Sequence, residues 1–436
     1  MKLNYKRTFF VGFAFLSICA FWEVYEGIVP KMLEGTFGLG ETKVGAIMAI
    51  DNVLALFLLP IVGAISDKVN TRIGRRMPFI LGGTLMAAAF ILILPIADYQ
   101  GNFILFMVAL AVVLLAMASY RSPAVALMPD VTPKPLRSKA NAIINLMGTL
   151  GGVYALLMTL LLYKDDGSVN LPVFISVVAI MILSLIFLMV TINENKLSKI
   201  AKEEEKAFYL ENDMLKEGLK EEQESKEDSH SLDSSEEKMP ADVKRSFAFI
   251  MASIFLWFFA YNAVKTAFSR YADRVWGYSG GTYTFPLMVA MGAALVSYFP
   301  IGIISNKIGR KKTIIAGILL MTFSYLCGFL INQATPLINV VFACTGIGWA
   351  AINVNSYPMV VEMCKRADTG KYTGYYYTFS MSAQIITPIV SGFLMEKIGV
   401  YTLFPYALVF SIASLCTMIF VKHGDSIIQV KKEEEA

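Results

Sequence analysis

The sequence predicts an all-α membrane protein, with twelve transmembrane helices arranged in two pseudo-symmetric six-helix bundles. Hydrophobic residues make up 56% of the 436-residue chain and charged residues only 17%, with a mean hydropathy of +0.58. The apolar residues form runs that are long enough to cross a bilayer as helices. Motifs of the first half also recur, in the same order, in the second half. Because a soluble protein carries more charge, this composition argues against a soluble enzyme.

Runs of roughly 20 apolar residues, the length that a helix needs to cross the hydrocarbon core, define the expected spans. In the first half they cover 8–30, 44–65, 78–97, 103–128, 141–163 and 171–192. In the second half they cover 246–267, 284–304, 313–331, 337–357, 375–395 and 402–421. We therefore expect four parts: a first bundle (1–192), a charged linker (193–245), a second bundle (246–421) and a tail (422–436).

An internal repeat relates the two halves. GAISDKVNTRIGRR (63–76) matches GIISNKIGRK (302–311), apart from four extra residues in the first copy. The first spans of the two halves also share an aromatic pair, Trp22 with Tyr25 and Trp257 with Tyr261. Two parallel six-helix repeats are the layout of alternating-access transporters, in which the substrate site lies between the halves.

The short loops divide the basic residues unevenly. Twenty lysines and arginines fall on the side that carries both ends of the chain, against six on the other side. By the positive-inside rule, both termini and the linker are expected in the cytoplasm of a multi-pass plasma-membrane protein. The linker holds 16 acids and 10 bases and is interpreted as a tether, with a regulatory role as the alternative. The net charge of +4 does not indicate a nucleic-acid partner.

The sequence gives no support for an enzyme, a metal or a cofactor. Its two histidines, His230 and His423, lie outside the spans, and its five cysteines are scattered. GIGWAA (346–351) and GTLGG (148–152) lie within apolar spans, so we interpret them as helix-packing surfaces rather than nucleotide-binding loops.

A charged motif at the inner end of the second span resembles the Major Facilitator Superfamily. Asp67 is followed by three arginines, and in this superfamily such residues form a latch on the cytoplasmic side. The second half has Asn306 in place of the acid, so its latch is expected to be weaker. The predicted gate residues are Asp67, Arg72, Arg75, Arg76 and Arg310.

Three segments resemble a narrower group within this superfamily. Residues 60–80 look like plant sucrose–proton symporters and their animal and bacterial relatives, and 121–148 and 348–363 look like bacterial members of that branch. The four-residue insertion is shared with glycoside–pentoside–hexuronide cation symporters, but Ala55 and Leu59 replace acids that help to bind the cation there. The resemblance implies import of a disaccharide or α-glucoside by a monomer in the bilayer, coupled to protons, with sodium as the alternative ion.

Five ionisable residues lie within the expected spans, where a charge usually faces a cavity or a partner. Asp51 is the first choice for the proton-coupling acid, with Glu23 as an alternate carboxylate; a structural, hydrogen-bonded Asp51 remains the alternative. Glu26 and Lys265 are expected to approach each other as a gate or around substrate, unless each extends to the interface. Arg121 is equally suited to a substrate contact and to a structural ion pair.

Sugar binding requires neutral hydrogen-bonding groups beside an aromatic platform. The spans supply several such side chains, each of which could instead pack in the protein or face lipid. With the charged residues, the predicted substrate-binding set is Tyr25, Glu26, Arg121, Trp257, Tyr261, Asn262, Lys265, Trp349, Asn353, Asn355 and Gln384.

Two other functions remain open at this level. A drug or metabolite antiporter would share the fold, although the fifth span (141–158) lacks the Gly-Pro motif that such exporters often carry. A sugar sensor would bind its ligand without moving it and would use the linker for signalling.

Overall fold

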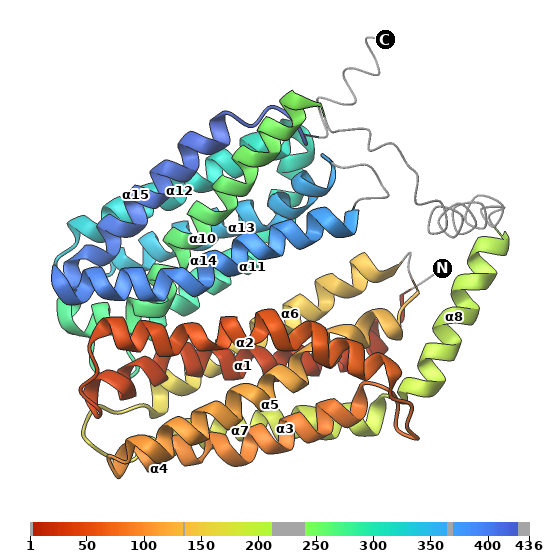
Figure 1. Ribbon diagram of the computed structural model, residues 1–436, viewed down its shortest axis with the longest axis horizontal. Helices are drawn as coiled ribbons and strands as arrows, with labels where there is room; N and C mark the ends of the chain where they lie inside the picture. Colours follow the sequence, from red (N-terminus) through yellow and green to blue (C-terminus); the bar gives the residue numbers. More distant parts are fainter. Residues whose placement is uncertain (1–2, 134–135, 212–239, 364–368, 426–436) are drawn as a thin grey trace.

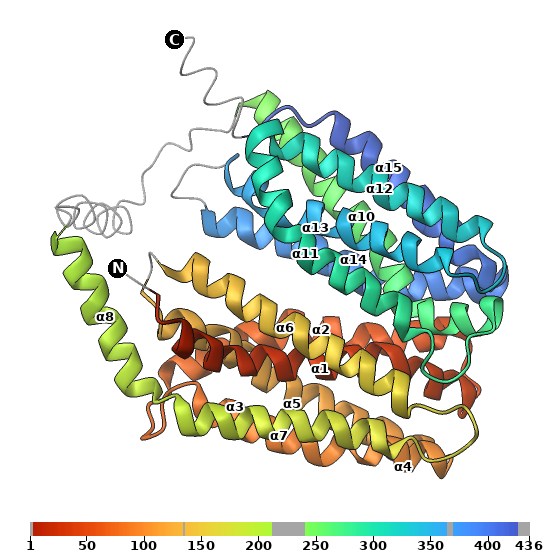
Figure 2. The same cartoon turned by 180° about the vertical axis from the view of Figure 1, so that it is seen from behind.

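The computed structural model describes residues 3–133, 136–211, 240–363 and 369–425 (Figure 1). Within these ranges the chain is almost entirely helical, and twelve helices are long and apolar enough to cross a membrane. They form two bundles that lie side by side, as both views of the ribbon show (Figures 1 and 2). The predicted all-helical, twelve-span fold is confirmed.

In the described part of the chain, seven helices build the first bundle, because the third span is broken in two. They are α1 (Tyr5–Gly35), α2 (Glu41–Lys68), α3 (Met77–Ile91), α4 (Ile93–Tyr99), α5 (Phe103–Asp130), α6 (Arg137–Leu162) and α7 (Leu171–Thr191). The sequence predicted one helix over 78–97, but Pro95 has no N–H to offer the carbonyl of Ile91, so the hydrogen-bond ladder is interrupted there. Helix α8 (Glu194–Glu211) follows α7 within the predicted linker.

Among the residues that the structure describes, the second bundle contains six helices and one short 3₁₀ turn. They are α10 (Ala241–Trp276), α11 (Thr284–Ile308), α12 (Arg310–Leu330), α13 (Leu337–Val361), α14 (Thr369–Lys397), η3 (Val400–Thr402) and α15 (Leu403–Ile419). Helix α10 extends nine residues beyond the predicted end of its span at 267. Arg270 and Arg274, which follow the predicted span and were counted among the six basic residues in loops on that side, instead lie on the last turns of this helix.

The molecule has two ends that differ in how closely the bundles approach. At one end α1 and α10 begin and α8 lies across the first bundle; we call this end the α8 face, and the opposite end the far face. In both views the ribbons of the two bundles lie close together toward the far face and diverge toward the α8 face (Figures 1 and 2).

Glycines allow the bundles to meet closely near the far face. A Cβ atom on Gly45 of α2 would lie 2.0 Å from the carbonyl oxygen of Pro388 in α14, and one on Gly392 of α14 would lie 2.4 Å from that of Glu41. Any larger side chain would therefore push these helices apart. The predicted packing motifs act in the same way within each bundle, since Gly151 faces the carbonyl of Leu16 and Gly346 faces that of Ala290.

Candidate functional site: a cavity between the bundles

A cavity of about 230 Å³ lies between the two bundles. Helices α1 and α6 of the first bundle and α10, α11 and α13 of the second bundle contribute to its wall. Its lining includes the polar residues Glu23, Glu26, Tyr261, Lys265 and Ser269. It also includes the apolar residues Leu156, Leu287, Ala290, Met291 and Ala294.

An ion pair crosses the cavity from one bundle to the other. The Nζ atom of Lys265 on α10 lies 2.7 Å from Oε2 of Glu26 on α1, and both side chains are largely buried. Glu23 lies one turn before Glu26 on the same helix face and also lines the cavity. The two residues that the sequence paired from equivalent places in the two halves are thus in direct contact.

Two aromatic side chains stack on each other beside this ion pair. The rings of Tyr261 on α10 and Trp349 on α13 stack with a centroid separation of 3.8 Å and an interplanar angle of 4°. Both residues line the cavity. This pair has the form of the aromatic platform that the sequence analysis expected.

Seven of the predicted binding residues lie outside the wall of this cavity, and six of them are packed or bonded elsewhere in the bundles. Trp257 is 1% exposed and packs in the core of the second bundle, and Tyr25 is buried in the core of the first. Three side-chain amides donate to backbone carbonyls one turn earlier in their own helices: Asn262, Asn355 and Gln384. The side chain of Asn353 is half-buried.

Asp51 and Arg121 lie close to the cavity without forming its wall. The Oδ1 atom of Asp51 accepts a hydrogen bond of 2.8 Å from the side chain of Asn52. The guanidinium of Arg121 lies 5.7 Å from the centre of the Trp22 ring, at a distance that permits a cation–π interaction. The charges of Glu26, Arg121 and Lys265 all act on Asp51, so these ionisable groups form one connected cluster.

Sequence reasoning missed several polar residues of the cavity, among them Ser269, Thr149, Thr345, Tyr283 and Tyr298. Helical spacing would have predicted Ser269. Because residues four apart share a helix face, the choice of Tyr261 and Lys265 points to Ser269 one turn further on. The tyrosines and threonines carry no such signal, because many similar residues in the spans face elsewhere.

Four charged residues close the far face, and we call them the far-face cluster: Glu34 and Glu41 of the first bundle with Arg270 and Arg274 of the second. The Nε atom of Arg270 lies 2.9 Å from Oε2 of Glu41, and both side chains are 5% exposed. Arg274 pairs with both acids, at 3.2 Å from Glu41. Two acids balance two bases, so the cluster is neutral and joins the bundles by charge-assisted bonds.

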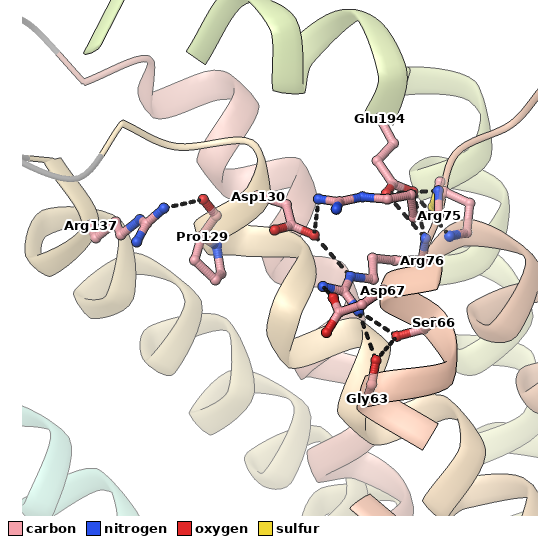
Figure 3. Close-up of polar contacts among 10 residues, drawn as sticks. Gly63, Ser66, Asp67, Arg75, Arg76, Pro129, Asp130, Arg137 and Glu194 are labelled. Atoms are coloured by element: carbon pink, nitrogen blue, oxygen red, sulfur yellow. Dashed lines mark hydrogen bonds and ion pairs between the residues drawn. The ribbon is translucent and has the colours of Figure 1, made fainter. Parts of the chain in front are cut away.

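At the α8 face a second network lies within the first bundle (Figure 3). The guanidinium of Arg76 contacts Asp67 of α2 and lies 2.8 Å from Oδ2 of Asp130 at the end of α5, and Arg75 lies 3.2 Å from the same atom. Burial lowers the pKa of Arg76, but the bonds and charges of Asp130 and Asp67 outweigh burial and raise it, so this arginine stays charged. The side chain of Arg72 is exposed and lies outside this network.

In the second bundle Arg310 pairs with Glu362. The side chain of Asn306, which the sequence analysis expected to weaken the latch here, is outside the described residues. None of the ion pairs that the structure records at this face joins the two bundles, whereas the far-face cluster does.

A buried carboxylate caps the start of the third span in each half. Glu194 at the start of α8 is 1% exposed and accepts hydrogen bonds of 2.9–3.1 Å from the backbone N–H groups of Arg75, Arg76 and Met77 (Figure 3). Asp425 similarly accepts from the N–H groups at the start of α12. Each acid lies against a glycine of positive φ, Gly74 or Gly309, where a Cβ would collide with the carboxylate. A carboxylate also suits the positive end of a helix dipole.

Replacing Glu194 by alanine should lower the stability of the protein, because three buried N–H groups lose their acceptor. We expect a loss of roughly 1–3 kcal/mol, seen as a lower midpoint in thermal unfolding of the detergent-solubilised protein. Glu204→Ala is the matched control, because Glu204 lies on the same helix, is half-exposed and pairs only loosely with Arg7 at 3.9 Å. Equal midpoints for the two variants would rule out a structural role for the Glu194 cap.

Replacing Arg270 by glutamine should separate the bundles at the far face, because the buried Glu41 loses the closer of its two partners and keeps only Arg274 at 3.2 Å. Breaking a buried ion pair costs about 3–5 kcal/mol, which is enough to shift a conformational equilibrium. Spin labels at Tyr99 and Ile398, both exposed near this face, should show a new population at longer distance in a background without native cysteines. Lys397→Gln, at an exposed position, should leave the distances unchanged. An unaltered distribution in the Arg270 variant would contradict the role of the cluster.

Comparison with known proteins identifies relatives of this chain in sequence and in fold. The family model of the Major Facilitator Superfamily matches residues 11–299 and 250–435. A segment of 112 residues is 29% identical to the chloramphenicol resistance protein CraA of Acinetobacter baumannii, and it covers 25% of this chain and 26% of that relative.

Solved transporter structures share the fold over nearly the whole chain. The xylose transporter XylE from E. coli, in an inward open conformation, gives a TM-score of 0.65 at 16% identity, covering 96% of this chain and 97% of that one. A POT family transporter in complex with 5-aminolevulinic acid gives a TM-score of 0.69 at 12% identity, covering 96% of this chain and 95% of that one. A family match over most of the sequence shows that the chain belongs to the Major Facilitator Superfamily, a family of membrane transporters.

Proposed function

We propose that this transporter imports a sugar, either a disaccharide or an α-glucoside, together with protons by alternating access. The observation that carries the proposal is the cavity between the bundles, where an aromatic platform stands beside an ion pair that joins the two halves. The α8 face is the cytoplasmic side in this proposal, because the basic loops gather there. The protein works in the plasma membrane.

The form of the cavity supports a sugar as the solute. Sugar rings have apolar C–H faces, which stack on aromatic rings, and hydroxyl groups, which bond to polar side chains. The stack of Tyr261 and Trp349 leaves an outer ring face as a flat apolar surface for such a sugar ring. Glu23, Glu26 and Lys265 lie beside that surface and offer acceptors and donors for hydroxyl groups.

The balance of charge in this region supports proton coupling. Glu23, Glu26 and Asp51 supply three acids, whereas Arg121 and Lys265 supply two bases, and the five groups are electrostatically connected. If all five are charged, the cluster carries one negative charge in excess within the membrane, which is unfavourable. A single proton removes the excess. Asp51 is the candidate carrier, because Glu26 already has Lys265 as its partner.

The arrangement of the bundles supports alternating access. The far-face cluster holds the bundles together at one end, while the ribbons diverge at the other end (Figures 1 and 2). In our proposal this is the state in which the cavity communicates with the cytoplasm. Import requires a second state, in which the cluster separates and the bundles meet at the α8 face.

A drug antiporter is the second candidate, and two observations favour it. Leu156, Leu287 and Met291 form an apolar wall that suits a drug-like molecule as well as it suits the face of a sugar ring. The segment that resembles the chloramphenicol resistance protein also points to export, although it covers about a quarter of that relative.

Uptake by proteoliposomes separates the two functions. With an imposed gradient that is acidic outside, we expect accumulation of maltose or sucrose above equilibrium, and none without the gradient or with an uncoupler. Chloramphenicol should not be exchanged for protons. Proton-driven movement of chloramphenicol without any uptake of sugar would replace the symport proposal with the antiporter.

Asp51→Asn should abolish uphill sugar uptake and leave sugar exchange across the membrane intact, because an amide cannot carry the proton. Asp166→Asn is the control, since Asp166 lies in an exposed loop and its low pKa, caused by hydrogen bonds from Ser168, keeps it charged. Both activities are measured with labelled sugar in proteoliposomes. Equal loss of uptake and exchange in the Asp51 variant would remove this residue from the coupling role.

A further inference from the structure

One face of α10 presents three different chemical groups to the cavity. Tyr261, Lys265 and Ser269 follow one another at intervals of four residues and all line its wall. The aromatic platform is at one end of this row, the ammonium group is in the middle, and a hydroxyl group is at the end nearest the far face.

The hydroxyl of Ser269 differs from the other aliphatic hydroxyls of the cavity wall. Ser269 is 3% exposed, and within the described part of the chain its Oγ atom has no hydrogen-bond partner. Thr149 and Thr345 instead donate to carbonyls of their own helices, Asn145 and Val341, each at 3.0 Å. Because a buried polar group without a partner is unfavourable, the free hydroxyl of Ser269 is suited to a ligand that enters the cavity.

The position of Ser269 also fixes how far a ligand must reach. Eight residues of α-helix separate it from Tyr261, a rise of about 12 Å along the axis. A single sugar ring that stacks on the platform reaches the ammonium of Lys265 but not this hydroxyl. A second ring joined to the first covers the remaining distance.

From this row of groups we propose that Ser269 is a specificity-determining residue, which bonds to the second ring of a two-ring sugar and so favours disaccharides over monosaccharides. This inference rests on the proposed sugar transport. In the bound complex the first ring lies on the outer face of the Tyr261–Trp349 stack, and Lys265 contacts hydroxyl groups between the two sugar rings. The second ring lies beside Ser269, at the end of the row nearest the far-face cluster.

The test compares kinetics of uptake in proteoliposomes for sucrose, maltose and glucose. Ser269→Ala should raise the KM of the transported disaccharide about five- to tenfold, the effect of one lost hydrogen bond, and leave the KM of glucose unchanged. Ser269→Thr keeps a hydroxyl and should recover most of the affinity. Thr266→Val is the matched control on the same helix, because Thr266 is outside the cavity lining and its hydroxyl already donates to the carbonyl of Asn262 at 2.8 Å; it should change neither KM.

Three results would overturn the inference in different ways. A disaccharide KM that is equal in Ser269→Ala and Thr266→Val shows that the hydroxyl of Ser269 makes no contact with the solute. A rise in KM of the same size for glucose and for the disaccharide shows that Ser269 binds the first ring. If wild-type protein takes up none of the three sugars, the proposed function fails and this inference fails with it. Thermal unfolding of each variant separates these results from misfolding.

Discussion

Charge pairs that join the two bundles determine which movements this structure permits. Bringing a charge out of water is costly unless an opposite charge meets it, and here the partners come from different bundles. The far-face cluster joins the two bundles at one end, and the pair of Glu26 and Lys265 joins them across the cavity. The bundles therefore cannot separate at the far face until water or a solute takes the place of these partners.

Helices α1 and α10 each contribute residues to both the cavity and the far-face cluster. A movement of either helix therefore changes both sites. On α10, Lys265 and Ser269 line the cavity and Arg270 follows directly. On α1, Glu26 lines the cavity and Glu34 belongs to the cluster two turns later. Because packed helices move as rigid bodies, a solute held between α1 and α10 acts on the same two elements that the cluster joins.

The spans, the repeat and the approach of Glu26 to Lys265 could be predicted, because each depends on hydrophobicity or charge along the chain. How far each helix is rotated about its axis does not follow from those patterns. Asn262 is next to Tyr261 in sequence, yet its amide bonds to its own helix while Tyr261 lines the cavity. Contacts between segments far apart in the chain could not be predicted from the sequence either. Glu194 caps a helix start 118 residues away, and no local pattern marks the pairing.

The excess acid in the cavity region has a consequence for how the membrane potential acts on the proposed cycle. With one proton bound, the five ionisable groups are neutral, so the loaded protein crosses between its states without moving net charge. After the proton and sugar leave, the same groups carry one negative charge, and the return step moves that charge outward. Moving one elementary charge across the membrane is worth about 2.3 kcal/mol per 100 mV. A potential that is negative inside therefore favours the return of the empty protein to the outward-facing state. In the proposed cycle, the membrane potential promotes uptake by acting on this return step.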